Sequence, residues 1–199
     1  FAGAVAADVL SEMAALREGL GPGADILVDL HWKYPAPEAI QLITALEAHT
    51  LSVAEAPVHP EDIEGLAMVA GAVNTPIGCG EELRTVFEFL PQPEMGRTGI
   101  TSFVRIATLA QAFHRPIMPH ASIGIGLFQA ASLHVSAALD HVTRHEYQHS
   151  VFDRNLQFVD GDMACAAGRF SVPSGSGLGV SPNESLFDKV ISAVEVTSS

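Results

Sequence analysis

Basic residues, cysteines and long apolar runs are all scarce in this chain of 199 residues. Ten Lys and Arg stand against 23 Asp and Glu, giving a formal net charge of −13. This balance disfavours binding to nucleic acid or to an anionic membrane, because both need a basic surface. No apolar run reaches the roughly 18 residues that span a bilayer, and no segment resembles a signal peptide, so we expect a cytoplasmic protein.

Two cysteines, Cys79 and Cys165, are too few for a disulfide framework. Their small neighbours favour an interpretation as buried free thiols.

Hydrophobic residues, in contrast, make up 48% of the chain, which is enough for one sizeable core or for part of a larger one. Short apolar runs alternate with segments in which apolar residues recur every three or four positions. The runs predict buried strands at 26–28, 51–54, 76–78 and 116–119. The periodic segments predict helices over about 4–20, 37–46, 60–73, 98–113 and 124–139.

Acidic or histidine side chains that follow short apolar runs recur at a regular spacing along the chain. Six of them are separated by 26, 26, 13, 26 and 26 residues: Asp29, Glu55, Glu81, Glu94, His120 and Glu146. One strand, one helix and two short loops consume a constant length of this order. The carboxyl ends of parallel barrel strands share one rim, so the phase predicts an α/β fold of the (β/α)8, TIM-like type with these side chains on that rim.

The number of strand–helix repeats is smaller than a closed barrel needs. Six strand ends are fewer than the eight of a closed barrel, so we expect the chain to cover roughly strands 3 to 8. The interval between Glu81 and Glu94 is too short for a loop, a helix and a strand, which leaves open a true deletion or residues missing from the sequence. We expect the barrel portion over 1–160, then an irregular Gly-, Ser- and Pro-rich extension over 161–199 with a final helix at 187–196.

Three carboxylates at successive strand ends, Asp29, Glu55 and Glu81, are the most specific part of the pattern. Any one acid in such a place is more often a helix cap or a surface charge. Equal spacing distinguishes the three as a set, and hard oxygen ligands of this kind hold Mg²⁺ with room left for substrate oxygens. The sequence therefore predicts a magnesium site.

The motifs around these positions resemble the enolase superfamily, in its mandelate racemase branch. The resemblance covers nearly the whole chain and rests on Asp29-Leu30-His31, Glu55-Ala56-Pro57, Gly80-Glu81, Gln92-Pro93-Glu94, Pro119-His120 and Glu146. The Asp-X-His form looks most like the acid-sugar dehydratases of the galactonate type. The resemblance implies an N-terminal capping domain and first strands outside this chain, and assembly into an even-numbered homo-oligomer.

The resemblance also implies which residues act on the substrate. His120 would take the C2 proton of a sugar acid, and Glu94, where the family usually has Asp, would orient His120. A neutral imidazole suits a base near neutral pH. Glu146 would hydrogen-bond the developing enediolate through a protonated carboxyl. The three strand-end acids would bind Mg²⁺, which stabilises the dianion that forms when a proton leaves next to a carboxylate.

His31 would protonate the departing C3 hydroxyl, and it lies two residues after Asp29, which on a continuing strand would place both on one face. Trp32 and Arg84 stand just beyond predicted metal ligands and are candidate substrate contacts. The seven histidines other than His31 and His120 are interpreted as surface or packing residues, although His145 and His149 flank Glu146 closely enough for one of them to touch substrate.

The resemblance thus implies a Mg²⁺-dependent hydro-lyase that converts a sugar acid to a 2-keto-3-deoxy acid. Two alternatives stay open. A racemase or epimerase of a 2-hydroxy acid would need a second base, normally a Lys on a strand that this chain does not contain. A barrel homologue that has lost turnover would keep the fold without the chemistry. Which sugar acid is the substrate is not encoded in these motifs.

Overall fold

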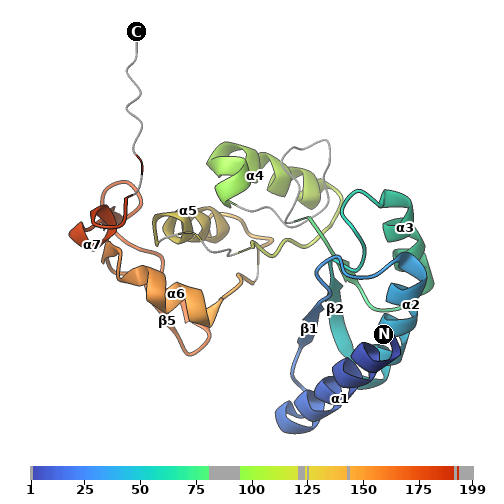
Figure 1. Cartoon of the computed structure of the whole chain (residues 1–199). Coiled ribbons are helices and arrows are strands. Elements are labelled where there is room, and N and C mark those ends of the chain that lie inside the picture. The colour runs from blue at the N-terminus through green and yellow to red at the C-terminus, as the bar shows by residue number, and fades with distance from the viewer. Residues whose placement is uncertain are drawn as a thin grey trace. The chain divides into compact units, whose positions relative to one another are not determined.

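The computed structural model describes residues 2–80, 95–120, 124, 126–142, 144–190 and 192. The chain divides into two compact units, residues 1–82 and 83–199, and each is described by itself (Figure 1). Among the described residues, none of the helices combines the length and the apolar character that crossing a bilayer requires.

The first unit is a parallel sheet with helices along one face (Figure 1). The strands lie in the order β1 (Ile26–Asp29), β2 (Leu51–Glu55) and β3 (Ile77–Gly78). The helices are α1 (Ala2–Leu20), α2 (Ala36–Leu46) and α3 (Ile63–Ala72), with a short 3₁₀ turn η1 (Glu47–His49) after α2. Both strand pairs are parallel, so the predicted alternation of strand and helix is confirmed in this unit.

Helix α2 shows how the sequence pattern becomes packing. Pro37 occupies its first turn, where a missing N–H costs nothing. Its buried residues recur about once per helical turn and form one stripe: Ala36, Ala39, the adjacent pair Leu42 and Ile43, and Leu46. The stripe belongs to a core that also contains Met13 of α1, Val69 of α3 and residues of β1 and β2. Each helix therefore contributes one apolar face to a single core.

Arg17 of α1 ties together the chain segments that lead into the first two strands. Its guanidinium donates hydrogen bonds of 2.8–2.9 Å to the carbonyl oxygens of Gly21, Ala24, His49 and Thr50. The first two carbonyls precede β1 and the other two precede β2. One side chain thus fixes the starts of both strands.

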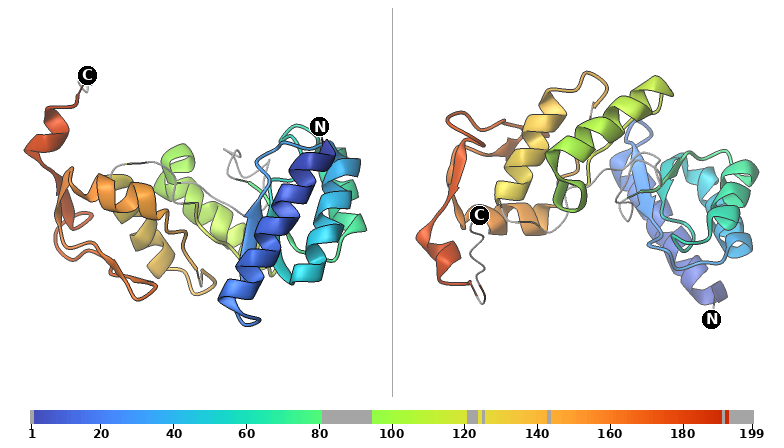
Figure 2. Two further views of the ribbon diagram at one scale, coloured as in Figure 1. Left: turned by 60° about the horizontal axis from the view of Figure 1, so that its bottom comes forward. Right: turned by 90° about the horizontal axis from the view of Figure 1, so that it is seen from above.

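The second unit is mainly helical (Figure 2). Its main helices are α4 (Met95–Ala112), α5 (Gly126–Ala137) and α6 (His149–Leu156). Helix α5 contacts both α4 and α6. Gly99, with φ of 68°, interrupts α4, so its regular part begins close to the predicted start at 98.

Two extended segments of the second unit run parallel to each other. Ile117 and Val142 form a parallel bridge, and the N–H of Glu146 donates to the carbonyl of Pro119 at 3.4 Å. The first segment is the one predicted as a strand at 116–119. Its apolar residue Ile117 is buried against α4, in a cluster with Ala107 and Ala110.

The C-terminal segment is more regular than its composition suggests. Two antiparallel pairs form there: β4 (Val159–Gly161) with β7 (Val180–Pro182), and β5 (Cys165–Ala166) with β6 (Arg169–Phe170). The short helix α7 (Glu184–Phe187) ends where the predicted final helix at 187–196 was to begin. Asp188–Val190 are not helical, and residues 191 and 193–196 of the predicted helix lie outside the described residues. Both cysteines are half-buried, not buried as predicted.

Candidate functional site

Asp29 and Glu55 end the first two strands of the sheet and are partners in its ladder. The register of β1 and β2 pairs Asp29 directly with Glu55. Paired residues of neighbouring strands project to the same face, so the two carboxylates lie side by side at the carboxyl end of the sheet. Asp29 is exposed and Glu55 is half-buried, which leaves both accessible.

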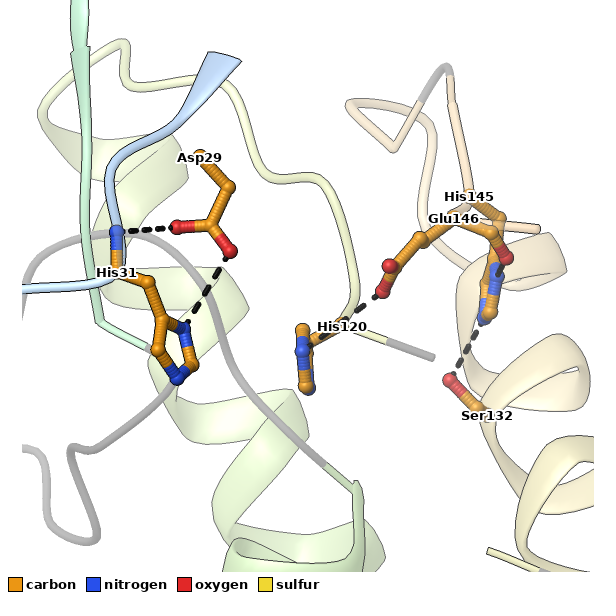
Figure 3. Close-up of polar contacts among 6 residues, drawn as sticks. All are labelled: Asp29, His31, His120, Ser132, His145 and Glu146. Atoms are coloured by element: carbon orange, nitrogen blue, oxygen red, sulfur yellow. Dashed lines mark hydrogen bonds and ion pairs between the residues drawn. The ribbon is translucent and has the colours of Figure 1, made fainter. Parts of the chain in front are cut away.

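His31 lies against the Asp29 carboxylate through a turn of the backbone. Its N–H donates to Asp29 Oδ1 at 2.8 Å, and its Nδ1 lies 3.5 Å from Oδ2 (Figure 3). The expectation that His31 continues the strand is wrong, because β1 ends at Asp29 and His31 has a φ of 46°. This left-handed turn, and not strand alternation, brings the imidazole to the carboxylate.

Backbone strain is concentrated at this end of the sheet. Trp32 and Ala56 have φ of 59° and 46°, and a non-glycine residue in this region costs about 1–2 kcal/mol. The N–H of Leu30 bonds to the carbonyl of Glu55 at 2.9 Å, and that of Trp32 to the carbonyl of Ala56 at 2.8 Å. Backbone hydrogen bonding therefore continues beyond the ends of the strands and holds the strained residues in place. Strained backbone of this kind clusters at functional sites.

Trp32 packs on His31, with ring centroids 4.4 Å apart, so the two predicted substrate-facing side chains of this segment touch each other. The predicted metal ligand Glu81, the substrate contact Arg84 and the orienting acid Glu94 lie outside the described residues. Their roles stay predictions.

The chemistry of Asp29 and Glu55 suits a hard divalent cation. A carboxylate has about four lone-pair positions, so Asp29 keeps acceptor positions beyond those that face His31. Mg²⁺ binds through one or two carboxylates together with water and substrate oxygens. Within the described ranges no cluster of three His, Cys, Asp or Glu side chains could hold a metal ion, and the third predicted ligand falls outside them.

His120 and Glu146 form a second cluster, at the ends of the two parallel segments of the second unit. Nε2 of His120 lies 3.9 Å from Oε2 of Glu146 (Figure 3). Their side chains are 20% and 36% exposed, so both are partly accessible to solvent. A substrate carbon and its oxygens placed there could contact a base and a carboxyl together.

His145, next to Glu146, makes contacts that sequence spacing did not reveal. Its Nε2 lies 2.8 Å from Oγ of Ser132 on α5, and its Nδ1 lies 2.9 Å from the carbonyl oxygen of Glu146. Burial lowers the pKa of His145 below its ordinary value of 6.5, against the smaller opposing effects of the Glu146 carbonyl and carboxylate. The ring is therefore neutral near neutral pH.

Two other histidines behave as the predicted packing residues. Nε2 of His134 lies 3.0 Å from the carbonyl oxygen of Leu178, and Nε2 of His141 lies 2.9 Å from that of Ala107. Each joins a helix or loop to a neighbouring segment.

The first unit holds paired carboxylates, and the second holds an imidazole beside a carboxylate. Both features agree with the predicted superfamily, and a comparison with protein families identifies the family. Residues 2–186 match the family described as Enolase C-terminal domain-like. The chain belongs to the enolase superfamily. The matched domain is part of a (β/α)8 barrel, so the predicted fold class is confirmed.

Two curated relatives are sugar-acid dehydratases. The chain is 30% identical over 194 residues to a D-galactonate dehydratase of Ralstonia nicotianae, covering 89% of this chain and 50% of the relative. It is 30% identical over 168 residues to an L-talarate/galactarate dehydratase of Salmonella typhimurium, covering 79% of this chain and 42% of the relative. The chain thus spans about half the length of the curated relatives it matches.

Solved structures share the fold at higher identity. A protein of Sinorhizobium meliloti, described provisionally as an isomerase, is 49% identical with a TM-score of 0.86, over 90% of this chain and 51% of that one. An enolase superfamily member of Agrobacterium tumefaciens is 42% identical with a TM-score of 0.86, over 90% and 49% of the two chains.

Proposed function

We propose that this protein is a Mg²⁺-dependent dehydratase of sugar acids, which removes the C2 proton and eliminates the C3 hydroxyl to give a 2-keto-3-deoxy acid. Relatives named galactonate, talarate/galactarate and gluconate dehydratases, at 28–30% identity, support the reaction class. The structural observation that carries the proposal is the contact of His31 with Asp29, beside Glu55. This contact supports the proposal because an imidazole beside the proposed cation site could act as the proton donor that elimination of a hydroxyl needs.

His120 would start the reaction by accepting the C2 proton on its imidazole. The electron pair of the broken C–H bond then passes toward the substrate carboxylate and forms an enediolate. Glu146, whose carboxyl oxygen is 3.9 Å from His120 Nε2, would donate a hydrogen bond to an enediolate oxygen. Acid and base therefore act on one end of the substrate from neighbouring segments.

Asp29 and Glu55, with Glu81, would hold the magnesium ion. When bound, Mg²⁺ supplies positive charge that stabilises the extra negative charge of the enediolate. The two described carboxylates fit this task because they occupy neighbouring strand ends on one face of the sheet.

His31 would complete the reaction as general acid. The enediolate electrons form the C2–C3 double bond while the C3–O bond breaks, and the departing oxygen takes a proton from His31 to leave as water. The enol that remains tautomerises to the 2-keto acid. The left-handed turn that seats His31 on Asp29 supports this role, because it places the imidazole beside the proposed cation site.

A second candidate is an isomerase that uses the same C2 proton abstraction without loss of water. It is favoured by the 49% identical protein of Sinorhizobium meliloti, described provisionally as an isomerase. The two reactions differ in mass balance, because a dehydratase product is lighter by one water and an isomerase product is not.

The test is a screen of the protein with Mg²⁺ against a panel of aldonates and aldarates. Formation of a 2-keto product is measured directly. Deuterium incorporation at C2 of the remaining substrate is followed by NMR in D₂O. We expect both signals with at least one sugar acid and neither after chelation of the metal. Exchange or stereoisomer formation without a keto product would favour the isomerase, and absence of all signals across the panel would refute both.

A further inference from the structure

Glu146 is held from the side opposite its carboxyl group by the residue that precedes it. His145 makes one hydrogen bond to Ser132 of α5 at 2.8 Å and one to the backbone carbonyl of Glu146 at 2.9 Å (Figure 3). Successive side chains of an extended segment point in opposite directions. The His145 ring therefore reaches back to α5, while the Glu146 carboxyl reaches toward His120.

The two partners of His145 define where its proton sits. A carbonyl oxygen only accepts hydrogen bonds, so Nδ1 carries the hydrogen and donates it to Glu146. In the neutral ring Nε2 is then an acceptor, and the hydroxyl of Ser132 donates to it. Burial of the ring lowers the pKa of His145, which favours this neutral form. Ser132 is fully buried, so it is not a nucleophile open to substrate.

The aromatic ring of Phe170 supports the same segment. It meets the His145 ring edge-on, with centroids 5.3 Å apart, and the Tyr147 ring at 5.9 Å. Tyr147 also packs on Phe152 of α6 at 5.3 Å. Both neighbours of Glu146 are thus packed on Phe170 of β6.

We propose that Ser132 and His145 form a positioning pair that sets the direction of the Glu146 carboxyl, with Phe170 holding the His145 ring in place. This inference rests on the proposed function, in which Glu146 stabilises the enediolate. The pair does not touch substrate; it acts by fixing the backbone from which the Glu146 side chain projects.

The kinetic test uses variants that separate the hydrogen bonds from the packing. His145→Phe keeps a ring beside Phe170 but removes both hydrogen bonds, Ser132→Ala removes one partner, and His145→Asn keeps a donor near the Nδ1 position. We expect His145→Phe to lower kcat by about ten- to a hundredfold with little change in KM, the scale that a displacement of about 1 Å produces. His145→Asn should recover part of this loss.

The matched control is His134→Phe, which removes another histidine of the second unit that bonds to a backbone carbonyl. It should leave kcat unchanged once the folded fraction is accounted for. A loss of thermal stability in His145→Phe without any change in kcat would overturn the proposal, because that is the result of a purely structural role.

A double-mutant cycle with Glu146→Gln tests whether the pair acts through Glu146. If it does, His145→Phe causes almost no further loss of kcat in the Glu146→Gln background. Independent and additive losses would overturn the proposal.

A measurement without substrate separates this inference from the proposed function. In ¹⁵N NMR spectra His145 should show a single tautomer with the hydrogen on Nδ1 at pH 7, and Ser132→Ala should change both the tautomer balance and the ¹³C shift of the Glu146 carboxyl. An unchanged Glu146 signal would refute positioning even in an active enzyme. If no sugar acid is turned over but these shifts occur, the proposed function fails while the positioning stands.

Discussion

Asp29 and Glu55 occupy the same rung of the parallel ladder between β1 and β2. This relationship requires that the two strands, which are separated by α2, run in the same direction and are in register at their carboxyl ends. Two negative charges at neighbouring positions repel each other unless a cation or hydrogen-bond donors compensate them. The close pair of carboxylates at Asp29 and Glu55 therefore favours the binding of a cation at these strand ends.

Replacing either acid should weaken Mg²⁺ binding. We expect Asp29→Asn and Glu55→Gln each to raise the Kd for Mg²⁺ at least about tenfold, since even the loss of a residue behind a metal ligand has that effect. Isothermal titration calorimetry measures it. Asp25→Asn is the control, because Asp25 lies before β1 and accepts a hydrogen bond from Ser52. Unchanged affinity in both acid variants would remove them from the metal site.

The two proposed histidines should separate the two halves of the reaction. With a sugar acid found in the screen, His120→Asn should lower the rate of C2 deuterium exchange about a hundredfold or more, because the base is gone. His31→Asn should preserve exchange and suppress formation of the keto product. NMR in D₂O follows both signals in one sample. Equal loss of both in His31→Asn would mean that His31 is not a dedicated acid for the hydroxyl.

The sequence predicted the rung of Asp29 and Glu55 because a strand-and-helix unit has nearly constant length, so a 26-residue phase reports register. The sequence also placed His31 near Asp29, but by strand alternation, which is not what brings them together. The contact comes from a local turn with a left-handed φ of 46° at His31, and such a turn has no periodic sequence pattern. The contact of Ser132 with His145 depends on how α5 packs, which spacing does not encode. The short strands of the C-terminal segment were missed because two or three residues are too few to show an alternating pattern.

Stability of the first unit should depend on pH through Glu47. Its carboxylate accepts hydrogen bonds from the backbone N–H groups of Asn74 and Thr75 and from both side chains. These bonds, that of the Asn74 side chain first, lower the pKa of Glu47 below its ordinary value of 4.5. The stabilisation is therefore present above about pH 4.5 and is lost as pH falls through the lower pKa of the folded state.

Glu47→Gln tests this, because the amide cannot accept all four bonds. Urea unfolding curves at pH 7 and at acidic pH should show the variant less stable than the wild type at pH 7, and the difference should shrink as the pH falls below 4.5. The control Glu38→Gln changes an exposed acid of α2. A difference that stays constant with pH would show that the charge of Glu47 does not stabilise the fold.

Arg17 should be more important for stability than its position on an outer helix suggests. Its guanidinium serves four carbonyl oxygens in the segments that start β1 and β2. A Lys ammonium has three donors on one atom and cannot match that spread, so Arg17→Lys should cost about 2 kcal/mol of the free energy of unfolding. Urea denaturation followed by circular dichroism measures the loss, with Arg105→Lys at an exposed position of α4 as the control. If Arg17→Lys matches the wild type, the four hydrogen bonds contribute nothing net to folding, and the strand starts must be held by the apolar core alone.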